Sequence, residues 1–530
     1  MLKNTRFKGS SAVRALAVTG ALIASGASFA DPVTLKSVDG SVDLVGELLK
    51  FEKNVYTIKT VIGELNVSAE QVRCVGADCP VFENVEADLV LAGSDTVGLG
   101  LMPLLLEGWA ATQDAEASMI NPPGSAHVVA QIVGDQGFGD PINAVKVSST
   151  TSGDAFRYLL SGEADIGMAS RAIRREEARI LRAAGKGNMR DSSQEHIIAV
   201  DSLVVIVHPD NNISRLTIDQ MAGIYSGQIR NWAEVGGKDA PINIHDFRDG
   251  SGTRSSFMNA IFSGDEVEVA GAQVQPNNVE MSDTITSDPN AIGYVGYAFQ
   301  RGAKPLSLVN ECGITMTPDT FSVRTEEYSL QRRLYLYNTS DGLSEEADAL
   351  VDYIQSTEAD EVIEKSGFIS LGVDSRVQSN DSPRAQALLQ PSRDPLERVK
   401  KSEMLEVMPG YDRLSSTFRF RTGSSQLNER AAIDMARLTD YLKDAPQGTE
   451  VLFVGFTDSV GTYRNNQNLS ERRAAAVMNT LRNLSGDALN NVQMASTGYG
   501  EIVPSACNVN AQGREINRRV EVWVSTPEQS

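Results

Sequence analysis

The pattern of apolar and polar positions divides the chain of 530 residues into regions of different character. Residues 31–86 alternate apolar and polar positions in short runs separated by turn residues, as in Val55-Tyr56-Thr57-Ile58, which predicts a small β module. In residues 87–375, strand-like runs alternate with helix-like runs. This order is typical of an α/β fold with parallel strands, in which ligand sites lie at the strand ends.

The rest of the chain is predicted to be a linker followed by a further folded domain. Residues 376–410 are polar with spaced prolines, which favours a linker containing one short helix near 395–404. Residues 411–530 show an α+β pattern, and the alternation along 519–524 is expected for a sheet with helices on one face. The predicted strands are 417–420, 451–456, 492–497 and 519–524, and the predicted helices are 428–443 and 470–484.

Residues 1–30 have the features of a secretory signal peptide. A basic start that includes Lys3 and Arg14 precedes a short alanine-rich apolar run, and the expected cleavage site lies between Ala30 and Asp31. No other run approaches the ~20 apolar residues of a membrane-spanning helix. We therefore expect the mature chain to be exported to the periplasm without a transmembrane segment. A lipid anchor is not expected, because no Cys follows the cleavage site.

The chain is strongly acidic, with 69 Asp and Glu residues against 48 Lys and Arg residues and a formal net charge of −21. Phosphate backbones bind to basic surfaces, so this charge argues against a nucleic acid as partner. It also means that an anionic ligand must be captured by local groups rather than attracted by the field of the whole protein.

Cysteine and histidine positions predict one disulfide and no metal or cofactor site. Cys74 and Cys79 are separated by Val-Gly-Ala-Asp and can close a small loop in an exported protein. Cys312 and Cys507 fall in different predicted domains, so we expect them to be free or locally buried rather than bridged to each other. The histidines are scattered without metal-ligand spacing, which argues against a zinc or catalytic-histidine site.

A polar loop near the C-terminus carries charged residues in a binding arrangement. Residues 451–454 predict a buried strand, and a helix is expected to begin at Ser470 with Arg473 in its first turn. Between the two lie Asp458 and Asn466. A carboxylate and a guanidinium held apart on a rigid frame can bind a zwitterion through charge-assisted hydrogen bonds. The alternative is that Asp458 caps its loop and that Arg473 is a solvated surface residue.

Three motifs in this region resemble the outer membrane protein A-like (OmpA-like) peptidoglycan-binding domain. They are Thr457-Asp458-x-x-Gly461, Asn466-x-x-Leu469-Ser470-x-x-Arg473-Ala474 and Asn517-Arg518-Arg519-Val520-Glu521, in the order of that family. The resemblance covers roughly residues 411–528. It implies that Asp458 and Arg473 bind the diaminopimelate of peptidoglycan stem peptides, with Asn466 as a supporting contact. The chain departs from the family at Phe456, where the family often has His; this leaves the Asp–Arg pair intact.

Three segments of the middle region are rich in Gly, Ser and Thr at points where a helix is expected to begin. They are residues 93–97, 148–153 and 248–254. A helix N-terminus presents unpaired N–H groups and the positive end of a dipole, which suits an oxyanion, and hydroxyls add further donors. Because Ser and Thr are also common helix caps, one such segment is weak evidence and three in one region are stronger.

The order of these segments resembles the phosphate-transporter type (PstS-like) of periplasmic substrate-binding protein. Asp249-Gly250-Ser251-Gly252-Thr253 is the most specific element, Tyr328-Ser329-Leu330-x-Arg332 continues the likeness, and the resemblance covers nearly all of residues 87–375. It implies a type II periplasmic binding protein fold, in which two α/β lobes close on a hinge around an oxyanion. The implied ligand contacts are Thr96, the Val97 backbone, Ser149, Arg248, Ser251, Gly252 and Thr253.

The chain departs from familiar phosphate binders at two positions. Phe247 stands where an Arg precedes the Asp-Gly-Ser-Gly-Thr element, and Arg248 comes one residue later. Ser170-Arg171 stands where some members have an Asp that accepts the proton of phosphate and so excludes sulfate. Phosphate is therefore the leading ligand by resemblance, and an Arg in place of that Asp could favour a fully ionised oxyanion such as sulfate.

The main hypothesis is a binding protein without catalytic activity that captures an oxyanion and is held to peptidoglycan by its C-terminal domain. A membrane ABC permease is a possible partner. The second hypothesis is a structural cell-envelope protein with a degenerate substrate-binding domain. The third is a periplasmic phosphatase that uses Ser251, for which His245 is the nearby candidate base.

Overall fold

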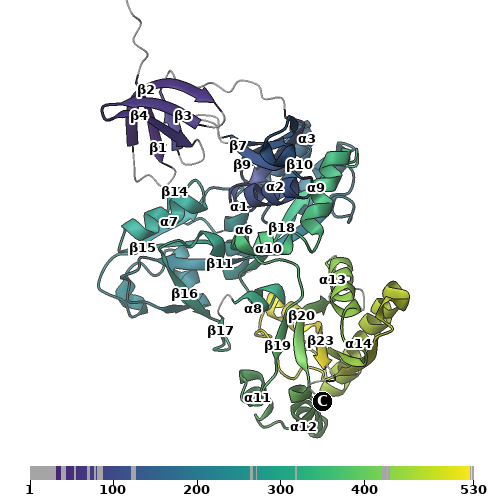
Figure 1. The fold of residues 1–530 in the computed structure, drawn as a ribbon. Coiled ribbons are helices and arrows are strands. Elements are labelled where there is room, and N and C mark those ends of the chain that lie inside the picture. The colour runs from purple at the N-terminus through teal and green to yellow at the C-terminus, as the bar shows by residue number, and fades with distance from the viewer. Residues whose placement is uncertain are drawn as a thin grey trace, which may run out of the picture. The chain divides into compact units, whose positions relative to one another are not determined.

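The computed structural model describes residues 32–37, 43–52, 55–68, 72–76, 79, 87–120, 127–262, 267–269, 271–316, 319–420, 427, 430–525 and 527 (Figure 1). The predicted signal peptide, residues 1–30, lies outside the described residues. The chain forms two compact units, Met1–Val81 and Phe82–Ser530. In the part of the chain that is described, no helix combines the length and the apolar character needed to cross a membrane.

The first unit is an antiparallel five-stranded sheet in the order β4-β3-β2-β1-β5. Its core contains Val33, Leu35, Tyr56 and Ile58, which are the apolar positions of the alternating pattern. The predicted disulfide between Cys74 and Cys79 is present, with its sulfur atoms 2.02 Å apart. The strands are β1 (Val33–Ser37), β2 (Asp43–Glu52), β3 (Val55–Thr60), β4 (Gly63–Ser68) and β5 (Val72–Val75).

A 13-stranded sheet organises the middle of the chain, in the order β14-β13-β15-β11-β18-β10-β6-β9-β8-β7 with three short strands beside that path. Its long strand β11 (Glu195–Val207) takes part in two lobes. Residues 195–202 pair with β18, and residues 203–207 pair with β15 and β16. The change of partners along β11 divides this α/β region into lobe 1 and lobe 2, as the resemblance implies.

Lobe 1 contains the strands on the β18 side, and lobe 2 contains those on the β15 side. The strands of lobe 1 are β6 (Leu89–Ser94), β7 (Glu116–Ile120), β8 (His127–Val133), β9 (Pro141–Thr150), β10 (Ile166–Ala169) and β18 (Gln331–Tyr337). Those of lobe 2 are β12 (Arg215–Thr217), β13 (Asn243–Phe247), β14 (Gln273–Gln275), β15 (Ala291–Gly296), β16 (Lys304–Val309) and β17 (Thr315–Met316).

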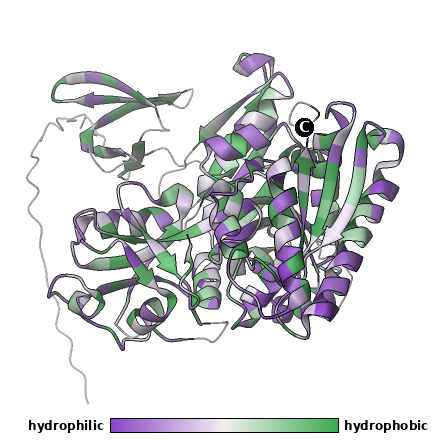
Figure 2. Ribbon diagram, turned by 90° about the horizontal axis from the view of Figure 1, so that it is seen from below, coloured by the Kyte–Doolittle hydropathy of each residue, from purple (hydrophilic) through white to green (hydrophobic). Residues whose placement is uncertain are grey.

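Helices cover the lobes, and the strands between them are largely apolar (Figure 2). Lobe 1 has α1 (Asp95–Gly100), α2 (Met102–Ala111), α3 (Ser152–Ser161), α4 (Arg175–Ala183), α9 (Glu345–Gln355) and α10 (Asp360–Lys365). Lobe 2 has α5 (Ile218–Tyr225), α6 (Gly252–Phe262) and α7 (Asn278–Ser287), and α8 (Thr320–Arg324) lies between the last strand of lobe 2 and β18.

The C-terminal domain is a five-stranded sheet in the order β19-β20-β23-β21-β22. Val520 and Val522 pack on one face with α13 and α14, and Trp523 packs on the other face with Met404 of α12. Helices therefore cover both faces, not one. The elements are β19 (Ser375–Val377), α11 (Pro383–Leu388), α12 (Pro395–Val407), β20 (Asp412–Arg419), α13 (Ala431–Lys443), β21 (Thr449–Gly455), α14 (Tyr463–Ser485), β22 (Val492–Gly498), α15 (Ala511–Asn517) and β23 (Arg519–Ser525).

The segment 376–410 differs from the linker expected from its composition. It contains α11 and α12, and the short helix predicted near 395–404 is part of α12. Arg384 on α11 forms an ion pair of 2.7 Å with the fully buried Glu521 of β23. The apolar residues of these helices are too few to reveal a core in the sequence, and they become buried only against the second face of the sheet.

Helix α14 begins at Tyr463 rather than after Ser470. Thr462 is its N-cap, and the Thr462 side chain accepts a hydrogen bond from the N–H of Asn465. Ser470 lies inside the helix, fully buried, where its hydroxyl donates to the Gln467 carbonyl and accepts from the N–H of Gly500. Ser470 therefore packs the helix against the sheet instead of starting it.

The prediction that Cys312 and Cys507 are not bridged was wrong. The two cysteines form a disulfide with Cα atoms 5.7 Å apart, across a sequence separation of 195 residues. Cys312 lies between β16 and β17 of lobe 2, and Cys507 precedes α15 of the C-terminal domain. The prediction failed because it treated the two domains as separate bodies on a linker, whereas they pack against each other.

Candidate functional sites

The Gly-Ser-Thr segments of the middle region converge at the ends of strands and form a cluster of hydroxyl groups between the lobes. The Ser94 hydroxyl donates to Ser170 at 3.1 Å, and the hydroxyls of Ser170 and Ser152 are 3.2 Å apart. The backbone N–H of Ser170 donates to the Ser152 hydroxyl at 3.0 Å. We call Ser94, Thr96, Ser152, Ser170 and Thr253 the hydroxyl cluster; all five are buried.

Gly252 brings lobe 2 close to this cluster. A Cβ atom on Gly252 would lie 2.2 Å from the Ser170 hydroxyl oxygen and 2.4 Å from that of Ser152. Any larger residue would therefore push the lobes apart at this point. This explains why glycine stands inside the Asp-Gly-Ser-Gly-Thr element, at the first residue of α6.

Arg332 of β18 supplies the positive charge of this site. Its guanidinium donates to the Thr253 hydroxyl at 2.7 Å and to the Thr96 hydroxyl at 3.2 Å, so it joins lobe 2 to lobe 1. It also donates to the Asp201 carboxylate at 2.8 and 2.9 Å. Sequence reasoning did not select Arg332 as a contact, although it lies in the Tyr328-Ser329-Leu330-x-Arg332 stretch that supported the resemblance.

The Arg332–Asp201 pair is almost completely removed from solvent, with side-chain exposures of 3% and 1%. Burial raises the pKa of Asp201, and the guanidinium of Arg332 opposes that shift. A carboxylate that accepts two hydrogen bonds from one guanidinium fixes the orientation of that guanidinium. Asp201 therefore holds Arg332 with its remaining N–H groups directed at the hydroxyl cluster.

Two arginines that the sequence suggested for the ligand lie elsewhere. The side chain of Arg248 is exposed, and the buried Phe247 packs against Tyr294 with ring centroids 5.4 Å apart. Arg171 pairs through both terminal nitrogens with Glu177, at 2.8 and 2.6 Å. Because the guanidinium of Arg171 is directed at Glu177, it does not supply a cation for the ligand at the position of the missing Asp.

The other predicted contacts lie beside the hydroxyl cluster. Ser149 packs against α1, and its buried hydroxyl has no hydrogen-bond partner among the described residues. Val97 is fully buried, and its carbonyl accepts from the N–H of Leu101. The Ser251 hydroxyl accepts from the N–H of Arg254 at 3.3 Å, so Ser251 caps the start of α6.

His245, the candidate base of the phosphatase hypothesis, is directed into lobe 2. Its Nδ1 lies 3.0 Å from the amide nitrogen of Gln275, and burial lowers its pKa. Within the described part of the chain, no three or more His, Cys, Asp or Glu residues are grouped so that they could hold a metal ion. The hydroxyl cluster and Arg332 thus offer donors for binding an anion.

Asp458 lies in the loop between β21 and α14, where two of its contacts keep it in place. Its carboxylate accepts from the N–H of Val460 at 3.0 Å, so it does cap its loop. It also pairs with Arg518 at 2.9 Å, with side-chain exposures of 13% for Asp458 and 9% for Arg518. The carboxylate is thus fixed and only slightly exposed, and Arg518 of the Asn-Arg-Arg-Val-Glu motif is a further charged residue beside it.

Arg473 lies on α14 and is buried, with 1% of its surface exposed. Its guanidinium lies over the ring of Phe420, 4.9 Å from the ring centroid. Burial lowers the pKa of Arg473 to about 10; Arg518 contributes to this shift, and Asp458 opposes it. Arg473 is therefore a cation near Asp458 at neutral pH, not the solvated surface residue of the alternative interpretation.

Asn466 and Glu501 complete this group. The side-chain amide of Asn466 donates to the Asp458 carbonyl at 3.2 Å and to the carboxylate of Glu501. Burial raises the pKa of Glu501, whereas the hydrogen bond from Asn466 lowers it. The structure thus brings Asp458, Asn466 and Arg473 together as the sequence predicts, and it adds Arg518 and Glu501.

The family comparisons agree with both resemblances. Residues 128–369 match the family model described as the PBP superfamily domain, and residues 419–518 match the OmpA family. Outer membrane porin F of Pseudomonas aeruginosa is 42% identical over 112 residues, which cover 21% of this chain and 31% of the porin.

Several curated relatives are named phosphate-binding protein PstS. That of Borreliella burgdorferi is 27% identical over 195 residues, which cover 35% of this chain and 69% of the relative. That of Bacillus subtilis is 28% identical over 178 residues, which cover 33% and 57%. The crystal structure of an ABC-type phosphate transport receptor from Vibrio cholerae is 23% identical and covers 53% of this chain and 99% of the receptor, with a TM-score of 0.39.

Proposed function

We propose that this chain, which joins a PBP-superfamily domain to an OmpA-family domain, captures inorganic phosphate in the periplasm while its C-terminal domain binds peptidoglycan. The relatives that match its middle region are phosphate-binding proteins, and the relative that matches its end is an outer membrane porin. The combination gives a solute-binding protein that is retained at the cell wall.

The position of Arg332 carries the proposal of an oxyanion site, and the relatives named phosphate-binding protein favour phosphate as its ligand. The chain has Phe247 where familiar phosphate binders have an Arg, but Arg332 reaches the hydroxyl cluster from another strand, within 2.7 Å of Thr253 and 3.2 Å of Thr96. A buried guanidinium beside neutral hydroxyl donors is suited to a small oxyanion. The cluster needs no catalytic step, because binding consists of replacing the water around the ion by fixed donors.

The peptidoglycan part rests on the arrangement of Asp458 and Arg473. A slightly exposed carboxylate and a buried cation near it match the ammonium and carboxylate groups of diaminopimelate. Free meso-diaminopimelate at millimolar concentration is expected to release the full-length protein from purified peptidoglycan, as measured in a sedimentation assay. Release by lysine to the same extent would contradict recognition of the zwitterionic end of diaminopimelate.

Titration calorimetry on the ligand-stripped full-length protein tests the phosphate part. Phosphate is expected to bind with micromolar or tighter affinity and sulfate much more weakly. Stronger binding of sulfate would overturn phosphate as the ligand and retain an oxyanion site. The heat of phosphate binding seen with the wild-type protein must also disappear when Arg332 is changed to Gln. This result separates binding in the cleft, which is the site formed by Arg332 and the hydroxyl cluster between the lobes, from adventitious binding at the surface.

A structural role without a ligand is the second candidate, and the contact of Gly252 with the hydroxyls of Ser152 and Ser170 favours it, because the lobes already meet there. A bound ligand raises the melting temperature by mass action. If phosphate, sulfate and other small oxyanions all leave the melting temperature unchanged, the middle region acts only as a scaffold of the wall-binding protein.

A further inference from the structure

The C-terminal domain contacts lobe 1 through a helix and through the chain that enters it. Arg437 of α13 donates to the Asp360 carboxylate at 2.7 Å and to the Gln355 carbonyl at 2.7 Å, next to α9 and α10. The chain itself leaves lobe 1 where Ile369 pairs with Val200 of β11 and then enters β19. The C-terminal domain is thus attached to lobe 1 covalently, by an ion pair and by a hydrogen bond to the backbone.

The same domain is attached covalently to lobe 2. Cys507 forms the disulfide with Cys312, which lies in the turn between β16 and β17. Beside it, the side-chain amide of Asn510 donates to the carboxylate of Glu311 at 3.2 Å. Lobe 1, the C-terminal domain and lobe 2 are therefore linked in a closed covalent ring.

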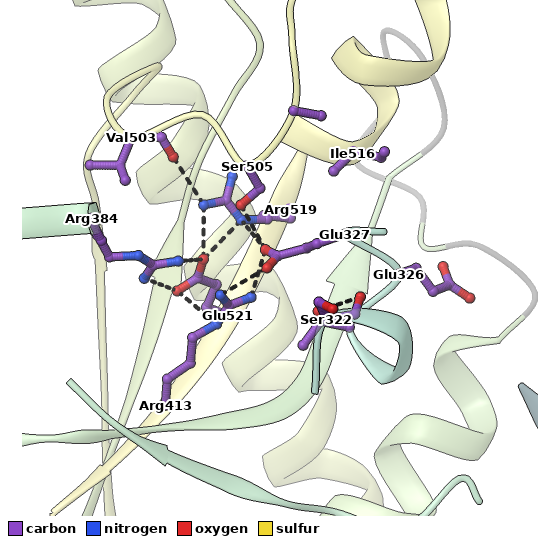
Figure 3. Close-up of polar contacts among 12 residues, drawn as sticks. Ser322, Glu326, Glu327, Arg384, Arg413, Val503, Ser505, Ile516, Arg519 and Glu521 are labelled. Atoms are coloured by element: carbon purple, nitrogen blue, oxygen red, sulfur yellow. Dashed lines mark hydrogen bonds and ion pairs between the residues drawn. The ribbon is translucent and has the colours of Figure 1, made fainter. Parts of the chain in front are cut away.

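A network of buried charges also joins the segment before β18 to the C-terminal domain, and Figure 3 shows the part around Glu327 and Glu521. Glu327 accepts from Arg413 at 2.8 Å and from the Ser505 hydroxyl at 2.6 Å. Its neighbour Glu326 pairs with Arg430 of the C-terminal domain at 2.8 Å and with Arg333 of β18 at 2.6 Å. The C-terminal domain therefore also holds the segment that runs into β18, the strand that carries Arg332.

The lobes are in contact with each other across the cleft. Arg174 of lobe 1 donates to the Ser255 hydroxyl of lobe 2 at 2.7 Å. The N–H of Gly153, at the start of α3, donates to the Gly250 carbonyl at 3.3 Å. This N–H lies in the first turn of its helix and has no partner within the helix. The contact between the lobes is therefore what protects it from hydrogen exchange with water.

From these contacts we propose that the C-terminal domain is a brace across the two lobes, which limits their opening and thereby sets the rate of ligand exchange. Opening at β11 must move the β16–β17 turn relative to α9 and α10. The brace joins those two places through the disulfide at one end and through the ion pair and hydrogen bond of Arg437 at the other. A hinge whose two sides are tied to a third body opens only if that body moves or a tie breaks.

The brace itself does not depend on the proposed function; only its effect on ligand exchange does. Hydrogen exchange at Gly153, followed by mass spectrometry on the full-length protein, measures lobe opening without any ligand. In the variant Cys312→Ser/Cys507→Ser, the Gly153 amide is expected to exchange about fivefold faster or more. The lobes open more often without the disulfide, and each opening breaks the hydrogen bond from Gly153 to Gly250. Equal exchange in the variant and the wild type would overturn the brace.

The variant Cys74→Ser/Cys79→Ser is the matched control, since it removes the disulfide of the other unit and should leave exchange at Gly153 unchanged. Arg437→Ala tests the opposite end of the brace with the disulfide intact, and a smaller increase in the same direction is expected. Should the Cys312→Ser/Cys507→Ser variant not fold, the Arg437→Ala result decides, and unchanged exchange there contradicts the proposal.

Stopped-flow measurement of inorganic phosphate binding gives the functional consequence. Without the Cys312–Cys507 disulfide, phosphate is expected to associate and dissociate faster, because both steps need open lobes. Absence of phosphate binding in the wild type would reject the proposed ligand while the exchange result at Gly153 still decides on the brace. Unchanged phosphate rates, together with faster exchange at Gly153, would overturn the control of ligand exchange.

Discussion

The two candidate sites of this protein are built in opposite ways. The cleft gathers neutral hydroxyls around one buried ion pair, and the residues that meet there are far apart in the chain: Arg332 bonds Thr96 across 236 positions. The C-terminal site gathers several charges, and Asp458, Asn466 and Arg473 come from one loop and the helix that follows it. A short motif could reveal the second site but only part of the first.

The difference lies in how each site balances charge. In the cleft, Arg332 is the cation and Asp201 pairs with it and orients it, so recognition of an anion rests on directed guanidinium and hydroxyl donors. At the C-terminal site, Arg473 and Arg518 lie near Asp458 and Glu501, so both signs are available to a zwitterion. A substitution at either site should therefore affect both stability and binding, with the larger loss of stability in the cleft, where Arg332 and Asp201 are almost completely buried.

The largest effect is expected from Arg332→Ala. This change leaves Asp201 as an unpaired buried carboxylate, which costs about 3–5 kcal/mol in the free energy of unfolding. It also removes donors to the ligand, so phosphate affinity should fall by about 100-fold. Chemical denaturation and titration calorimetry measure the two effects. The comparison between the sites fails if stability is unchanged.

Acidification should uncouple the unfolding of the two domains that carry the sites. Nearby arginines, chiefly Arg413, lower the pKa of Glu327 to about 2, despite burial, and they lower the pKa values of Glu326 and Glu521 as well. A carboxylate with a lower pKa in the folded state stabilises the fold above its unfolded pKa, and this contribution is lost as the pH falls through the folded pKa.

The interface should therefore weaken between pH ~4.5 and ~2, by an amount on the order of 3 kcal/mol for Glu327. Scanning calorimetry at successive pH values is expected to show one transition resolving into two as the pH falls through this range. Glu327→Gln should show this separation already at neutral pH. A single transition down to pH 2 in both proteins would mean that these charges do not hold the domains together.

At the C-terminal site, Asp458→Ala should weaken retention on purified peptidoglycan by about tenfold or more, the value of a charge-assisted hydrogen bond. Because the Asp458–Arg518 pair is largely buried, its loss should also lower the free energy of unfolding, by about 1–3 kcal/mol, which is less than for Arg332→Ala. Asp444→Ala, which changes an exposed acid of the same domain, is the control. Equal retention of both variants would remove Asp458 from the site.

The smallest effect is expected from Arg248→Ala. The sequence resemblance implies a ligand contact at this position, but the side chain is exposed. Phosphate affinity should therefore stay within about twofold of the wild-type value in calorimetry. A loss comparable to that of Arg332→Ala would show that Arg248 turns into the cleft when the ligand binds.

Motifs were informative where chemistry and sequence are local. The three Gly-Ser-Thr segments and the Asp458–Arg473 loop could be recognised from the sequence. Helix caps, glycines at close backbone contacts and a loop between a strand and a helix are each encoded by residues that are close together in the chain. The start of α14 was misplaced because Ser470 is a good cap by residue type, but Gly455 and Gly498 leave room for it to pack inside the helix against the sheet.

The sequence by itself predicted the α/β region, the small β module and the charged loop, because their alternation and motifs follow from local backbone and capping preferences. The division of the α/β region into two lobes was implied by the resemblance that those motifs carry. Only the tertiary structure decided that Arg332 supplies the charge of the cleft, that α11 and α12 close the second face of the C-terminal sheet, and that Cys312 meets Cys507. These three depend on contacts between segments far apart in the chain, and such contacts form only when burial of both partners brings them together.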